Sequence, residues 1–204
     1  ATGAPLKFYH GGLCDCLCSL GSKSSVCKVL SRPKPNKPCE AETAFEVQLK
    51  HVATKPELAL VVLDNKVMAL SPEAQHKAGA ALITQVVEQM FGHDFQGKVV
   101  VGVAKAEGLP FLEAAARASE ALGVEKRFYF TTDETGNDFE KTMRSYQSLN
   151  TDQLAYGTGR SGCYPGYFGS TMLKAANHEV FQPDKPVYVW TIDIAPSMEL
   201  YINK

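Results

Sequence analysis

The chain has 204 residues, of which 45% are apolar and 21% are charged, and its formal net charge is -1. These proportions are ordinary for a globular protein and exclude a disordered chain, a collagen and a coiled coil. The length predicts a single domain. Apolar runs reach about six residues, far short of the roughly 20 that span a bilayer. Because acidic and basic residues nearly balance, nothing in the composition indicates a nucleic-acid partner.

Hydrophobic periodicity and turn residues predict alternating strands and helices along the chain. In order, we expect a strand at residues 7–10, a helix at 40–53, a strand at 58–64, a helix at 71–91, a strand at 98–103, a helix at 109–122, a strand at 127–132, a helix at 138–146, a strand at 153–157, a helix at 170–180, a strand at 187–193 and a helix from 196. Ser71 is the expected N-cap of the helix at 71–91, with Pro72 at its first position. Gly123 ends the helix at 109–122.

The alternation of strands and helices predicts right-handed βαβ units and a parallel sheet. The run at 58–64 is apolar up to its final aspartate, which is typical of a strand covered on both faces. An eight-stranded α/β barrel usually needs about 250 residues. A doubly wound open sheet fits 204 residues without strain. The local pattern therefore leaves both architectures open.

Cysteine residues are concentrated near the start of the chain. Five of the six lie within the first 39 residues, and the sixth is Cys163. An even, clustered set indicates disulfides and an oxidising compartment. A zinc site or reduced thiols are the alternatives, but a zinc site normally has two C-x2-C pairs or partnering histidines. Here the spacing is C-x-C-x-C, and His10 is the only histidine nearby.

Several residues able to carry chemistry follow the predicted strands. In either parallel fold, functional groups gather beyond the carboxyl ends of the strands. These positions hold His10, Asp15, Asp64, Lys66, Asp133, Asn137, Asp138, Trp190 and Asp193. The set supplies an imidazole for acid–base chemistry, carboxylates for a hard cation and a lysine for a phosphate.

Each of these residues also has an ordinary structural interpretation. His10 alone would be a hydrogen-bonded packing residue, and Trp190 a core residue. Asp64 would cap a turn with Asn65, and Lys66 would be a solvated surface charge. The glycines at 157, 159 and 162 do not form a phosphate loop, and a dinucleotide-binding fingerprint is absent from the sequence.

Five sequence blocks together resemble one family. Residues 9–16 (YHGGLCDC) resemble the YHG-x-x-CDC signature of sphingomyelinase D, the phospholipase D toxin family of spider venom and its arthropod, fungal and bacterial relatives. Residues 60–66 (LVVLDNK) are similar to the family's VVFDLK strand, and residues 136–138 (GND) to its SGND turn. Residues 163–165 (CYP) and 188–193 (YVWTID) are similar to its NCLP and YYWTVD segments. The blocks occur in the family's order and span nearly the whole chain.

The resemblance implies catalytic residues and a metal. His10 is similar to one of two catalytic histidines, Asp15 to its supporting carboxylate, and Asp193 to a carboxylate that orients the site. Asp64 resembles a ligand of Mg²⁺, which is the cofactor that the resemblance implies. A hard divalent cation beside histidines would polarise a phosphodiester and stabilise its developing charge.

The implied reaction releases choline or ethanolamine from a sphingolipid or lysophospholipid. Lys66, Tyr188 and Trp190 resemble contacts to the substrate phosphate and headgroup. The substrate's own hydroxyl attacks phosphorus and leaves a cyclic phosphate, while two histidines serve as base and acid in turn. The implied partners are sphingomyelin, ceramide phosphoethanolamine or a lysophospholipid and, transiently, a membrane surface. The expected protein is secreted, extracellular and monomeric at full length.

The resemblance also implies a disulfide between Cys16 and Cys163, tying the first loop to a late one. Cys14 would then close a small loop with Cys18 or Cys27, and the sequence does not choose between them. Cys39 has no clear counterpart in the family.

The implied fold is a TIM-type (β/α)8 barrel of the glycerophosphodiester phosphodiesterase type. Blocks for the family's first strand with its histidine, for a Glu-x-Asp pair of metal ligands and for the last strand are lacking in this sequence. We therefore expect residues 1–204 to form a single barrel domain that is an internal portion of a longer chain. Because Asp64 would be the only one of the family's three metal ligands in this portion, we expect it to be poorly active.

Two other functions stay open. A glycerophosphodiester phosphodiesterase would hydrolyse small soluble diesters, but it usually lacks the disulfide that the CDC block and Cys163 indicate. A non-catalytic relative would bind lipid or membrane without turnover. The retained His10, Asp64, Lys66 and Trp190 argue against that function, and the lacking ligands argue for it.

Overall fold

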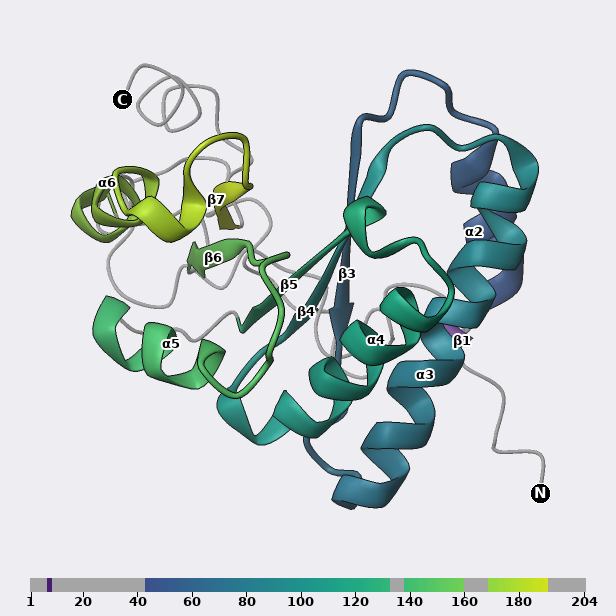
Figure 1. The fold of residues 1–204 in the computed structure, drawn as a ribbon. Coiled ribbons are helices and arrows are strands. Elements are labelled where there is room, and N and C mark those ends of the chain that lie inside the picture. Colours follow the sequence, from purple (N-terminus) through teal and green to yellow (C-terminus); the bar gives the residue numbers. More distant parts are fainter. Residues whose placement is uncertain (1–6, 9–42, 133–137, 160–168, 191–204) are drawn as a thin grey trace, which may run out of the picture.

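The computed structural model describes residues 7–8, 43–132, 138–159 and 169–190. Three parallel strands form its centre, in the order β3 (Leu60–Asn65), β4 (Lys98–Val103) and β5 (Phe128–Thr132) (Figure 1). A second parallel pair joins β6 (Tyr156–Gly159) to β7 (Val187–Trp190). The predicted parallel α/β architecture is therefore confirmed for these strands.

The two sets of strands meet at Phe130. Its backbone forms a parallel bridge with Leu154, in which the Phe130 N–H donates to Gln153 O at 2.8 Å and Ala155 N–H donates to Phe130 O at 2.9 Å. From β3 to β7, the described strands thus neighbour one another in chain order. A doubly wound sheet reverses its order at a switch point, and no reversal occurs along this run. The order is compatible with the predicted barrel, although the described strands do not close one.

Three helices begin or end at the residues that their sequence signals indicate. Ser71 caps α3 (Pro72–Gln89) by accepting a hydrogen bond from Ala74 N–H at 3.3 Å. Asp138 caps α5 (Phe139–Tyr146) in the same way, through Lys141 N–H at 2.9 Å. The α4 helix (Leu109–Ala121) runs out at Gly123, whose φ of 67° suits glycine. The other α-helices among the described residues are α2 (Phe45–Ala53) and α6 (Gly169–Ala176).

The first elements differ from the prediction. The strand β1 (Lys7–Phe8) pairs antiparallel with β2 (Thr43–Ala44), so the expectation of parallel strands throughout was wrong here. The helix expected from residue 40 begins at Phe45, because the two residues before it are extended in β2. Two residues give no periodic pattern, so the sequence carried no signal for β2.

Later strand boundaries also shift. The strand expected at 153–157 is β6 at Tyr156–Gly159, because residues 153–155 make only the single bridge to β5. Residues 9–10, 191–193 and the helix predicted from residue 196 lie outside the described residues. Within the described ranges, no helix combines the length and the apolar character needed to cross a bilayer.

The main core lies between the strands and the helices α3 and α4, which run side by side in Figure 1. The side chains of Val99 and Val101 on β4, and of Phe130 on β5, are fully buried against this layer. On the opposite face of β4, Val100 is equally buried, so this strand is covered on both sides as expected for a parallel sheet. The strand thus anchors two apolar layers.

The strand β3 does not follow that expectation. Leu63 is buried on the helix side, whereas Leu60 and Val62 on the other face remain 38% and 44% exposed. The prediction of cover on both faces was therefore wrong for this strand. The side chains that cover this face at Val100 of β4 are Tyr129, Ala155 and Tyr188, and this cluster includes no residue of β3.

Close approach of α3 and α4 depends on Gly79. A Cβ atom built at this residue would lie 3.2 Å from Ala115 N and closer still to the Phe111 carbonyl oxygen. We expect Gly79→Ala to lower the free energy of unfolding by about 1–3 kcal/mol, although alanine is the better helix former. Urea unfolding measures the change. In the control Gly92→Ala, the new Cβ would have its nearest neighbour at 3.5 Å, and a loss equal to that of Gly79→Ala would contradict the steric argument.

Burial raises the pKa of Tyr156 to about 12, with a further contribution from the negative charge of Asp138. The folded state therefore holds this proton more tightly than the unfolded chain, in which the pKa of tyrosine is about 10. The resulting stability is fully present below pH 10 and is lost as the pH rises from 10 through 12. We expect urea midpoints measured from pH 9 to 11.5 to fall more steeply for the wild type than for Tyr156→Phe. Parallel curves would contradict this assignment.

Candidate functional site

The best-described part of the predicted site is the carboxyl end of β3. Strand alternation places Asp64 on the same face as Leu60 and Val62, away from the helices. The Asp64 carboxylate (Oδ2) lies 2.5 Å from Lys66 Nζ, and the two side chains are 51% and 57% exposed. The structure therefore brings together two of the predicted residues as an ion pair open to solvent. The exposure of Lys66 also agrees with its ordinary interpretation as a solvated surface charge.

Small residues follow Asp64 across the same face. Its register partner on β4 is Gly102, and the partner of Gly102 on β5 is Thr131. On the next pair of strands, Gly157 of β6 is the register partner of Tyr188 of β7. Gly102 thus adds no side chain beside Asp64, and Gly157 adds none beside Tyr188.

Tyr188 lies on the sheet face opposite the helices. It is half-buried and packs against Val100, Tyr129 and Ala155. In the strand order, β4, β5 and β6 stand between Tyr188 and Asp64. Trp190 is the last residue of β7 and pairs with Gly159, but its side chain is outside what the structure describes.

Other predicted residues fall outside the described ranges, so their roles stay predictions. Those residues are His10, Asp15, Asp193, Cys14, Cys16, Cys18, Cys27, Cys39, Cys163, Asp133 and Asn137. Asp138 is described, and its side chain caps α5. That contact gives Asp138 a structural role.

The donor set for a cation is partial. Among the residues that the structure describes, no group of three or more histidine, cysteine or acidic side chains comes together as a metal site. Asp64 by itself offers exposed carboxylate oxygens, which are the ligands that Mg²⁺ prefers. Since Mg²⁺ is often held by one or two carboxylates together with water and substrate phosphate, Asp64 fits one such ligand.

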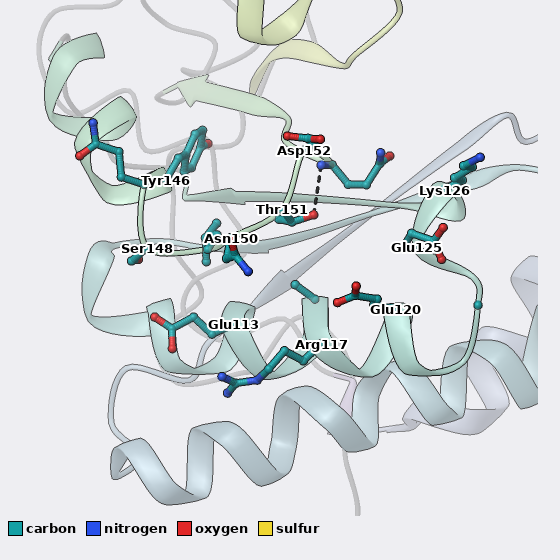
Figure 2. Close-up of a pocket in the computed structure, with 15 residues that line it drawn as sticks. Glu113, Arg117, Glu120, Glu125, Lys126, Tyr146, Ser148, Asn150, Thr151 and Asp152 are labelled. Atoms are coloured by element: carbon teal, nitrogen blue, oxygen red, sulfur yellow. Dashed lines mark hydrogen bonds between the residues drawn. The ribbon is translucent and has the colours of Figure 1, made fainter.

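A hollow of about 970 Å³ lies elsewhere, between α4 and residues 147–153 (Figure 2). Its charged lining mixes signs, with Glu113 and Asp152 beside Arg117 and Lys126. The hollow is next to the segments that lead into β5 and β6, at the amino ends of these strands. Active sites of parallel α/β folds lie at the carboxyl ends instead. The hollow holds none of the predicted site residues and is not the candidate site.

A buried hydroxyl network, which sequence reasoning missed, holds β6 beside β5. The Tyr146 hydroxyl donates to Ala155 O at 2.7 Å, lies 2.9 Å from Thr131 Oγ1 and accepts from Thr132 N–H at 3.3 Å. Thr131 Oγ1 in turn accepts from Gly157 N–H at 3.2 Å. These bonds supplement the single backbone bridge between the strands, and so they help to place Tyr188 of β7 through its pairing with β6.

The fold and the site define an α/β protein with parallel strands in chain order and a carboxylate–lysine pair at the carboxyl end of one strand. The family model described as dermonecrotic toxin SPH matches residues 1–204. The chain therefore belongs to the dermonecrotic toxin family, and the resemblance to the sphingomyelinase D toxins that the five blocks predicted is confirmed.

Individual relatives are distant but cover almost all of the chain. A dermonecrotic toxin of Loxosceles spinulosa is 25% identical over 216 residues, which cover 97% of this chain and 71% of the relative. Another, of Loxosceles aff. spinulosa, is 23% identical and covers 98% of this chain and 73% of the relative. A dermonecrotic toxin of Hemiscorpius lepturus is 25% identical, with 97% and 61% covered. The family assignment thus rests on the full length of the chain.

Removal of the Tyr146 hydroxyl tests the network. We expect Tyr146→Phe to lower the free energy of unfolding by about 2–4 kcal/mol, because buried groups of β5 and β6 lose a hydrogen-bond partner. Ser145→Ala is the matched control: its exposed hydroxyl donates to Lys141 O of the same helix at 3.2 Å, and we expect a change within about 0.5 kcal/mol. Equal urea midpoints for the two variants would contradict the role of the network.

Proposed function

We propose that the chain is a secreted phospholipase D of the sphingomyelinase D type, which releases choline or ethanolamine from a sphingolipid or lysophospholipid. The observation that carries the proposal is the family match over residues 1–204. The exposed Asp64–Lys66 pair at the carboxyl end of β3 supports it, since this is where a parallel α/β fold places its functional groups.

The proposed reaction is an intramolecular transfer at phosphorus. The substrate hydroxyl oxygen forms a new bond to phosphorus, and the bond from phosphorus to the choline or ethanolamine oxygen breaks. The hydroxyl proton passes to a histidine base, for which His10, supported by Asp15, is the candidate in this chain. The leaving oxygen takes a proton from an acid, and the phosphate remains as a cyclic diester.

Lys66, which directly follows β3, and residues of β7 would bind the substrate. The Lys66 ammonium has a flexible stem and a compact charge that suit a phosphate oxygen. Tyr188 and Trp190 would contact the headgroup, since aromatic faces attract a quaternary or primary ammonium, and Asp193 would orient the site. Asp64 would hold Mg²⁺, which supplies charge stabilisation for the phosphodiester when bound.

The proposed setting is extracellular, as the toxin relatives and the cysteine content suggest. Disulfides between Cys16 and Cys163, and between Cys14 and either Cys18 or Cys27, would then form. The partner is a phospholipid at a membrane surface, and the full-length protein would act as a monomer.

Phosphorus NMR tests the proposal directly. Sphingomyelin, ceramide phosphoethanolamine and glycerophosphocholine are each incubated with the protein, with Mg²⁺ or with EDTA. We expect a cyclic phosphate signal from a sphingolipid, and its loss in EDTA. Turnover of glycerophosphocholine alone would replace the proposal with a small-diester phosphodiesterase, and lipid binding without any turnover would indicate a non-catalytic relative.

Replacement of the metal ligand gives the sharpest mutational test. We expect Asp64→Asn to lower kcat/KM for the preferred lipid at least about 100-fold, because a neutral amide binds Mg²⁺ poorly and stabilises less charge at phosphorus. The matched control is Asp152→Asn, an exposed aspartate in the hollow at the other end of the strands. We expect this control to stay within about twofold of the wild type. Equal losses of kcat/KM in the two variants would contradict the assignment of Asp64 to the site.

A further inference from the structure

Asn65 is the last residue of β3 and stands between the two members of the ion pair. Its amide nitrogen Nδ2 donates to Leu63 O at 2.8 Å and to Gly102 O at 3.0 Å. The first bond bends back along β3, and the second crosses to β4, 37 residues away in the chain. The side chain is half-buried, in contrast to its exposed neighbours.

Both hydrogens of this amide thus have a carbonyl partner. An –NH₂ group carries two donors, and each of the two carbonyl oxygens accepts one of them. Bonds of 2.8 and 3.0 Å are in the range of good N–H···O geometry. The amide therefore links the last residue of β3 to a carbonyl of the same strand and to a carbonyl of β4. Both bonds lie where the hydrogen-bonded pairing of the two strands ends.

We propose that Asn65 is a positioning residue for the site, one that fixes the backbone on either side of it so that Asp64 and Lys66 present their charges in one geometry. The inference concerns the same site and rests on the proposed function for its chemical meaning. Neighbours that orient a metal ligand typically change metal affinity 10- to 100-fold when removed. Asn65 does not itself face the exposed side on which Asp64 lies.

The matched pair of variants is Asn65→Leu and Asn177→Leu. Leucine keeps nearly the shape of asparagine and removes both donors at residue 65. At Asn177, beyond the end of α6, it removes one amide bond to Leu173 O of 2.8 Å, far along the chain from the site. Thermal unfolding first establishes that both variants are folded. If Asn65→Leu does not fold, Asn65→Ser, which keeps one donor, is measured in its place.

Backbone amide hydrogen exchange tests the positioning without any ligand. We expect exchange at residues 63–66 to be at least ten times faster in Asn65→Leu than in the wild type, and unchanged in Asn177→Leu. Wild-type exchange rates at these residues in Asn65→Leu would overturn the inference. This outcome does not depend on whether the protein turns over lipid.

Titration with Mn²⁺, followed by paramagnetic broadening of the Asp64 and Lys66 amide signals, tests the link to the site. We expect Asn65→Leu to bind Mn²⁺ at Asp64 at least about 10-fold more weakly than the wild type and Asn177→Leu. Equal affinities would overturn the link. If the wild type shows no broadening at Asp64, the magnesium assignment of the proposed function fails and the link fails with it, whereas the exchange result still decides whether Asn65 positions the pair.

Discussion

The burial of β4 on both faces is the constraint on which the rest of the structure depends. Val99 and Val101 are buried in the layer beneath α3 and α4, and Val100 is buried on the opposite face. A slip by one residue would turn every side chain of the strand to the opposite face and would direct the exposed Lys98 toward the layer beneath α3 and α4. The register of β3 and β5 against it is fixed as a result, and so is the position of Asp64 opposite Gly102.

Side-chain hydrogen bonds connect this register to the candidate site. The Asn65 amide joins the end of β3 to the Gly102 carbonyl, and the Tyr146 hydroxyl joins β5 to Ala155 just before β6. One bond acts near the proposed metal ligand and the other near the strands that carry the proposed headgroup contacts. Neither residue needs to touch a substrate to affect the site, because each controls where a strand ends.

The sequence predicted best those elements whose signal is local. The boundaries of β4 were correct to the residue, since an apolar run lies between turn residues, and Ser71 marked the start of α3. The two-residue strand β2 was missed because its pairing with β1 is set by distant chain. Asp64 and Lys66 were predicted at a strand end, but the role of Asn65 was not, since its partner Gly102 is adjacent only in the fold. The open face of β3 was likewise invisible, because an apolar run does not say what covers each side.

The hydroxyl network around Tyr146 has an evolutionary consequence. Because the Tyr146 hydrogen goes to Ala155 O, Thr131 donates to the tyrosine oxygen, while its own oxygen accepts from Gly157 N–H. A relative that replaces either side chain with an apolar one leaves the other hydroxyl in a buried network with one hydrogen bond fewer. Positions 131 and 146 should therefore change together among family members, and chains that carry one without the other should be rare.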